Sequence, residues 1–219
     1  MNVLPIVGVM GSGVLAHEEL AAPLGRRLAG LGVHLLTGGG RGVMESVSRA
    51  FAAVEERDGL VIGVLPLPGP VAESGHPNRW VEIAIRTHLG KQGAEFSSRN
   101  HVNVLTSDVV VALPGSAGTA SEVALSVRYG RPVVLFGDLD RARGLPPEVA
   151  TAHTVEEVIA FVRQRLRDGR AGHEAGEPGG SGPGGQPGGR GLGGQPSGAG
   201  PGADRDTGTA DAGPSAAAP

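Results

Sequence analysis

The chain has 219 residues and no cysteine, and its 19 basic and 22 acidic side chains give a net charge of −3. This balance offers no excess of cations for a nucleic acid or an anionic membrane surface, and without cysteine there is no disulfide, thiolate nucleophile or Cys-based zinc site. The seven histidines lack metal-ligand spacing and no apolar run approaches the roughly 20 residues of a membrane span, so we expect a cytoplasmic protein without a metal site.

Glycine and proline divide the chain into two parts. Residues 169–219 hold 18 of the 39 Gly and 7 of the 17 Pro, and Leu192 is their one large apolar residue. Such a segment cannot bury enough apolar surface to offset the entropy lost on ordering, so we expect a disordered tail. Residues 1–168 carry all six aromatic residues and have the size of one ordinary domain.

Apolar runs alternate with segments of helical period along residues 1–168. Strands are predicted at 5–10, 33–37, 60–65, 81–85, 109–113 and 132–136, and helices within 20–31, 44–54, 120–127 and 155–166. The last helix begins with a capping-box pair, Thr154 and Glu157. A helix is also predicted within 91–107, although that stretch shows no clean period. The strands are mostly apolar throughout, as strands buried on both faces are. The sequence therefore predicts a three-layer, doubly wound Rossmann-like α/β domain: a mostly parallel sheet with helices on both faces.

Three glycine-rich turns each leave a predicted strand for a predicted helix. They are Gly11-Ser12-Gly13, Gly38-Gly39-Gly40-Arg41-Gly42 and Pro114-Gly115-Ser116-Ala117-Gly118-Thr119. Ligands of open parallel sheets bind where the strands end. Glycine lets the main chain approach a ligand, and the start of the next helix offers unpaired N–H groups to an anion. The turns therefore predict a phosphate site, to which Thr119 adds a hydroxyl and Arg41 a positive charge.

The same turns argue against two common nucleotide sites. Residues 11–16 match the G-x-G-x-x-A form of the dinucleotide fingerprint, but Thr37 and Gly38 stand where an acidic ribose ligand is expected. A dinucleotide is therefore disfavoured, while a mononucleotide remains compatible with the sequence. No G-x-x-x-x-G-K-[ST] sequence occurs, which excludes a P-loop NTPase.

The second and third turns together resemble the signatures of a known superfamily. Residues 37–44, TGGGRGVM, resemble GGGxxGxM, and residues 113–122, LPGSAGTASE, resemble PGGxGTxxE, both of the Lonely Guy superfamily. Its members include phosphoribohydrolases that release the base from cytokinin-type nucleoside 5′-monophosphates, and molybdenum-cofactor carrier proteins. The resemblance covers about residues 3–137 and implies a homodimer or higher oligomer.

Many members of the superfamily were once labelled lysine decarboxylases. A pyridoxal-dependent decarboxylase needs a lysine that forms a Schiff base. The single lysine, Lys91, lies in a polar segment without a recognisable site, so that activity is disfavoured.

The resemblance implies that Arg99 and Glu122 are the catalytic pair of a phosphoribohydrolase, which requires no cofactor. The Arg99 fork would hold the phosphate or the leaving base. Glu122, expected in the first helical turn after the third glycine turn and ionised there, would stabilise the positive charge that develops on the ribose. The leading hypothesis is that the protein binds a phosphorylated small molecule, a nucleoside 5′-monophosphate, with hydrolysis of its N-glycosidic bond as the activity that the resemblance adds.

Four positions depart from the hydrolase pattern and favour an alternative. They are Asn100, Ser116, Ala117 and Ser121. Of these, Asn100 and Ser121 look more like the carrier and uncharacterised branch, which implies a non-catalytic carrier or sensor of a phosphorylated cofactor such as the molybdenum cofactor. In both hypotheses the partner is a phosphorylated small molecule.

Residues 66–78 are long for a connection that follows a strand, and we expect them to form a lid over the site. Trp80, at the end of this segment, is a candidate for stacking on a base or for packing in the core.

Overall fold

The computed structural model describes residues 3–66, 76–90, 98–137 and 149–174. Within these ranges the strands are β1 (Ile6–Met10), β2 (His34–Thr37), β3 (Val61–Leu65), β4 (Ile83–Arg86), β5 (Val109–Ala112), β6 (Val133–Phe136) and β7 (Val149–Ala152). The helices are α1 (Glu18–Ala29), α2 (Val43–Ala52), α3 (Arg99–Thr106), α4 (Ala117–Arg128) and α5 (Val155–Glu174).

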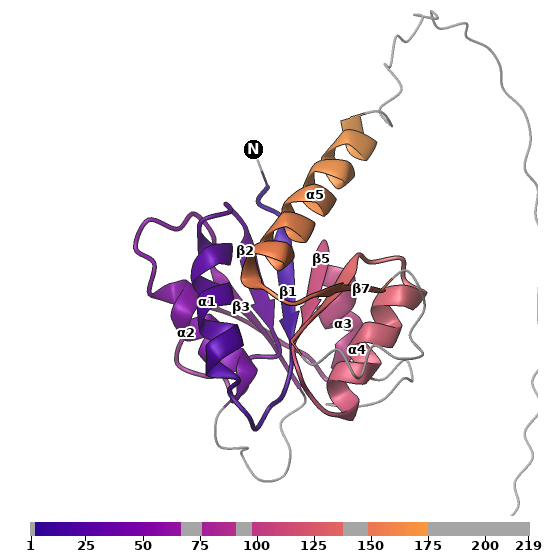
Figure 1. Cartoon of the computed structure of the whole chain (residues 1–219). Coiled ribbons are helices and arrows are strands. Elements are labelled where there is room, and N and C mark those ends of the chain that lie inside the picture. The colour runs from indigo at the N-terminus through magenta and orange to yellow at the C-terminus, as the bar shows by residue number, and fades with distance from the viewer. Residues whose placement is uncertain (1–2, 67–75, 91–97, 138–148, 175–219) are drawn as a thin grey trace, which may run out of the picture. The chain divides into compact units, whose positions relative to one another are not determined.

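The described strands form one parallel sheet in the order β4-β3-β2-β1-β5-β6-β7. The chain first builds outward from β1 through β2, β3 and β4, and then returns to the other side of β1 with β5 (Figure 1). The strand order therefore reverses between β1 and β5. In doubly wound sheets, ligands bind beyond the carboxyl ends of the strands at such a reversal.

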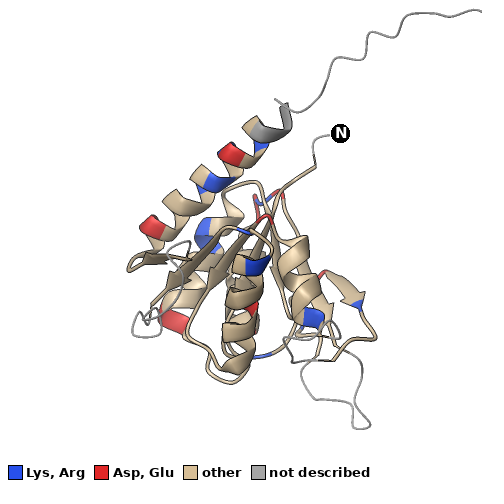
Figure 2. Cartoon of the chain, turned by 90° about the vertical axis from the view of Figure 1, so that its right-hand side faces the viewer, with Lys and Arg blue, Asp and Glu red and all other residues tan. Residues whose placement is uncertain are grey.

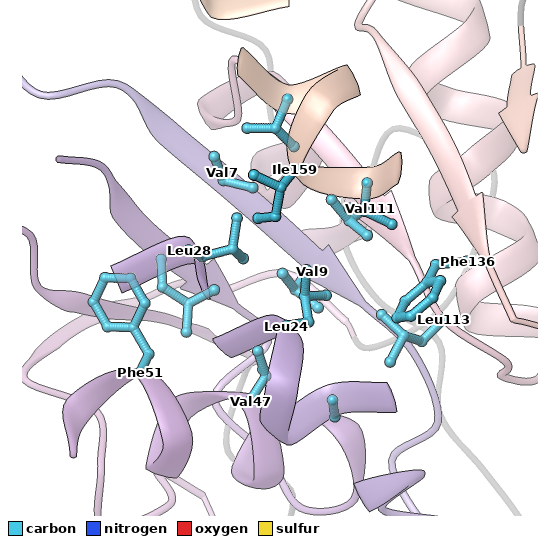
Figure 3. Packing of buried hydrophobic residues seen from close by; sticks show 14 of the residues in the cluster. Val7, Val9, Leu24, Leu28, Val47, Phe51, Val111, Leu113, Phe136 and Ile159 are labelled. Carbon is cyan, nitrogen blue, oxygen red and sulfur yellow. The ribbon is translucent and has the colours of Figure 1, made fainter. Parts of the chain in front are cut away.

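Helices cover both faces of the sheet, which confirms the predicted fold class. Helices α1, α2 and α5 pack on one face around a core that includes Val9, Leu24 and Val47 (Figure 3). Helices α3 and α4 pack on the other face, where Val110 and Val123 belong to a second apolar cluster. The central strands β1 and β5 are apolar throughout because they are covered from both sides.

The six predicted strands are confirmed to within two residues at each end, but β7 was not predicted. Its sequence, VATA, has one branched apolar residue, Val149, so it does not stand out as an apolar run. Helix α3 has no apolar period because four of its eight residues are buried and polar: Arg99, Asn100, His101 and Asn103. Both elements depend on tertiary contacts that a local pattern does not contain.

The capping box that begins α5 is confirmed. The Thr154 hydroxyl accepts from the Glu157 amide at 3.2 Å, and the Glu157 carboxylate accepts from the Thr154 amide at 3.3 Å. Helix α5 then continues through Gly169, where we placed the start of the tail, to Glu174. The remainder of that predicted tail, 175–219, lies outside the described residues.

The exposed side of α5 carries both signs of charge (Figure 2), with two glutamates in its first turn and mostly arginines further along. Across the described residues, no helix combines the length and the apolar character that spanning a membrane requires.

Candidate functional site

The first glycine turn is bonded to both of the others through the main chain of Ser12. Its amide donates to the Pro114 carbonyl of the third turn at 3.1 Å, and its carbonyl accepts from the Val43 amide, next to the second turn, at 2.9 Å. The Ser12 hydroxyl accepts from the amides of Val14 and Leu15 at 3.1 and 2.9 Å and so fixes its own turn. Three turns that lie far apart in the sequence therefore meet at the carboxyl ends of β1, β2 and β5.

Glycine at two positions makes this meeting sterically feasible. A Cβ at Gly42 would lie 2.3 Å from the Ser12 carbonyl oxygen, and the φ of Gly42 is +65°, which L side chains rarely adopt. A Cβ at Gly115 would lie 2.0 Å from Oγ1 of Thr119 and 3.1 Å from the carbonyl carbon of Gly11. Gly42 and Gly115 thus allow the second and third turns to pack directly on the first.

Asn78 holds the second turn from the other side. Its amide donates to the Gly39 carbonyl and its side-chain Nδ2 to the Gly40 carbonyl, each at 2.8 Å. Gly39 has a φ of +69°, and its amide donates to the Thr37 hydroxyl at 3.0 Å. Because Asn78 is buried, these bonds fix the path of the turn.

The three turns surround a cavity of about 400 Å³. Nine of the predicted site residues line it: Gly11, Gly13, Gly38, Arg41, Arg99, Ser116, Gly118, Thr119 and Glu122. Six others do not line it and instead shape the turns by the contacts described above: Ser12, Gly39, Gly40, Gly42, Pro114 and Gly115. The structure therefore brings the predicted residues together but divides them into a lining and a supporting set.

Helix α4 begins at the edge of this cavity. Ser116 is its N-cap residue, and its side chain makes no capping hydrogen bond. The first amide of α4 to bond back to the cap residue is that of Ala120, which donates to the Ser116 carbonyl at 3.1 Å. The amides before it, those of Ala117, Gly118 and Thr119, have no partner within a helix and are positioned to receive an anion.

Arg99, at the start of α3, is buried rather than exposed. Its Nη1 donates to the Val64 carbonyl at 2.5 Å and also to the Gly38 carbonyl, which ties α3 to β3 and the second turn. Burial lowers the pKa of the Arg99 guanidinium, and the nearby Glu122 carboxylate acts in the opposite direction. Its Nε is buried without a hydrogen-bond partner among the described residues.

The structure corrects two expectations about Glu122, its position in the helix and its charge state. It is the sixth residue of α4, so it lies in the second helical turn rather than the first. Burial raises the pKa of Glu122 to about 7, although an Asn103 hydrogen bond at 2.8 Å and the charge of Arg99 both lower it. The carboxyl group therefore titrates near neutral pH and is not held ionised by the helix N-terminus.

The cavity has lining residues that the sequence did not reveal. His76, Met44 and Asn100 contribute to it, and Asn103 supports Glu122 from α3. His76 stood inside the predicted lid, most of which, 67–75, lies outside the described residues. Trp80 is partly buried, lies beside Arg79 and is not among the described residues that line the cavity.

The strand order and the convergence of three glycine turns on one cavity define a Rossmann-like protein of the Lonely Guy type. The model of the SLOG cluster4 family matches residues 4–164, and the chain belongs to that family. The resemblance inferred from residues 37–44 and 113–122 is thereby confirmed.

Solved structures with similar sequences cover about three quarters of the chain. One is the molybdenum cofactor binding protein from the phototrophic bacterium Rippkaea orientalis, which is 34% identical, with 76% of this chain and 99% of that chain covered and a TM-score of 0.62. Another is the molybdenum cofactor carrier protein MCP from Chlamydomonas reinhardtii, which is 36% identical, with 75% and 99% covered and a TM-score of 0.57. An uncharacterized protein of Archaeoglobus fulgidus is 30% identical over 140 residues, which are 60% of this chain and 83% of that protein.

Proposed function

We propose that the protein binds a phosphorylated pterin of the molybdenum-cofactor type in the cavity between the glycine turns, and carries it unchanged. The observation that carries this proposal is the junction at Ser12, which joins the three turns around one cavity. The similarity to two proteins that bind or carry the molybdenum cofactor supports the choice of ligand.

The residues present fit such a ligand in size and in polarity. About 400 Å³ falls within the roughly 300–1,000 Å³ of small-molecule sites. The first-turn amides of α4 and the Thr119 hydroxyl suit a phosphate, and Arg41 and Arg99 supply positive charge beside the same cavity. The pterin ring would lie against apolar lining such as Val9 and Met44. The chain offers no thiolate to compete for the metal, so the pterin dithiolene would keep it.

Retention of the ligand tests this proposal. The full chain is produced in cells that make the cofactor and is purified without denaturation. The bound small molecules are then released, oxidised to a fluorescent pterin and identified by mass spectrometry. We expect about one phosphorylated pterin per chain. Recovery of no pterin from protein that melts cooperatively would contradict the proposal.

The Glu122 carboxyl group favours a second candidate, hydrolysis of a nucleoside 5′-monophosphate. A buried carboxyl whose pKa is about 7 suits general acid–base chemistry at neutral pH, and Glu122 shares the cavity with Arg99. Incubation with AMP would then release adenine and ribose 5-phosphate, and Glu122→Gln would abolish the release. Equal release by the wild type and the variant would exclude this activity.

Three predictions from the sequence remain predictions: the cytoplasmic location, the homodimer or higher oligomer, and the division into a folded domain and a disordered C-terminal tail. The tail was predicted at 169–219, and residues 169–174 of that range belong to α5.

A further inference from the structure

The ring of His76 lies against the second glycine turn with its polar atoms buried. Its Nε2 is 2.6 Å from where a Cβ on Gly40 would be, so a side chain at position 40 would require the ring to move. Both ring nitrogens are buried, and neither has a hydrogen-bond partner among the described residues. Buried polar atoms are nearly always paired. Because no described residue pairs with this ring, a bound ligand is a candidate for the missing partner.

The surroundings of the ring indicate the charge of that partner. The ionisable groups that line the cavity with His76 are Arg41 from the second turn, Arg99 from α3 and Glu122 from α4. Desolvation lowers the pKa of His76, and the positive charges of Arg99 and Arg41 lower it further. The ring is therefore neutral at neutral pH and stands in a cationic part of the cavity, which favours an anion.

We propose, building on the function proposed above, that His76 is a ligand-binding residue that donates a hydrogen bond to an anionic oxygen of the cargo beside the second glycine turn. The oxygen belongs either to the phosphate ester or to an oxo group on the metal, since both are anionic acceptors. A bound anion offsets the two guanidinium charges, so the imidazole takes up a proton as the ligand binds. Binding is then linked to proton uptake and weakens as the pH rises.

Titration calorimetry of the full chain with inorganic phosphate and with molybdate, each alone, tests this role. Each titration is run at about pH 6 and about pH 8 in two buffers with different ionisation enthalpies, which gives the number of protons taken up. We expect His76→Ala to weaken binding of at least one anion about tenfold, the value of one charge-assisted hydrogen bond. The anion affected identifies which group of the cargo His76 contacts.

His76→Gln distinguishes the contribution of the hydrogen bond to affinity from the contribution of proton uptake. Glutamine keeps an N–H donor but cannot be protonated, so this variant should regain part of the affinity while still taking up fewer protons than the wild type. Glu122 also takes up protons on anion binding, and its share should remain in both His76 variants. His153→Ala is the matched control, because His153 is exposed and does not line the cavity; it should behave as the wild type does.

Two outcomes keep this proposal and the proposed function apart. In the first, the wild type retains a pterin, and both His76 variants melt normally, bind both anions as the wild type does and take up the same number of protons. His76 then has no such role, and the carrier function stands. If the wild type retains no pterin and binds neither anion, the proposed function and the role of His76 both fail.

Discussion

Gly118 and Gly169 provide a matched pair of substitutions that separates stability from ligand binding. Each is a glycine within a helix, α4 for Gly118 and α5 for Gly169. Apart from the helix's own backbone and the neighbouring residues, no atom of the described residues lies within 4 Å of where a Cβ would be added. Alanine at either position therefore meets no steric obstacle and reduces the entropy of the unfolded chain. We expect each variant to be more stable by roughly 0.4–1 kcal/mol, which raises Tm by roughly 1–4 °C for a domain of this size.

The two variants should differ in ligand binding. Gly118 lines the cavity next to Thr119, whereas Gly169 is not part of the lining. A methyl group on Gly118 would keep a phosphate away from the first-turn amides of α4, and losing a hydrogen bond to a charged group costs roughly 1.5–3 kcal/mol. That loss corresponds to a decrease in affinity of about 10- to 150-fold.

Thermal melts and calorimetry with inorganic phosphate measure both effects on the same samples. We expect both variants to be more stable than the wild type, and only Gly118→Ala to bind phosphate more weakly. Wild-type affinity in Gly118→Ala would refute the assignment of the phosphate to the start of α4. A lower Tm for Gly118→Ala would refute the inference that its Cβ meets open space.

Three further predictions test the junction, the buried carboxyl and the helix cap. Gly42→Ala adds a Cβ 2.3 Å from the Ser12 carbonyl oxygen at a positive φ and should cost roughly 2–6 kcal/mol from strain and overpacking together; a wild-type Tm would contradict the described contact. Glu122 binds its proton more tightly when folded, since its pKa is about 7 against about 4.3 unfolded. The stability contributed by its protonation is therefore complete below about pH 4.3 and is lost as the pH rises to about 7. Glu122→Gln should for this reason raise Tm more at about pH 8 than at about pH 4. An equal change of Tm at both pH values would contradict this prediction. Thr154→Ala removes the α5 cap and should cost about 1 kcal/mol in urea unfolding, whereas an unchanged midpoint would show that the cap contributes nothing.

The general position of the site could be predicted because it depends on local patterns. Glycine after an apolar strand marks a turn, and parallel strands place such turns at one edge of the sheet. The sequence could not show which glycines face the ligand. Gly42 is required by its contact with the distant Ser12, and Gly115 by contacts with the distant Gly11 and with Thr119 of its own turn. The contacts between turns exist only in the folded chain.

The charge state of Glu122 could not be predicted for a related reason. Local sequence suggested a residue in the first turn of its helix, where the helix N-terminus favours a carboxylate. The helix begins at Ala117, and Glu122 is buried near Asn103 and Arg99 of α3. Because the buried face of α3 is polar, the sequence did not mark it as a packing partner, and burial of Glu122 against it had no visible signal.

We propose that the three glycine turns together hold a phosphorylated pterin. A crystal structure of the full chain grown with the pterin phosphate obtained by oxidising molybdopterin tests it most directly. The account predicts the phosphate within hydrogen-bond distance of the Gly118 and Thr119 amides, with His76 contacting an anionic oxygen of the ligand if that oxygen belongs to the phosphate ester. Ligand density outside the cavity, or a cavity filled by the protein's own side chains while the ligand binds in solution, would contradict it.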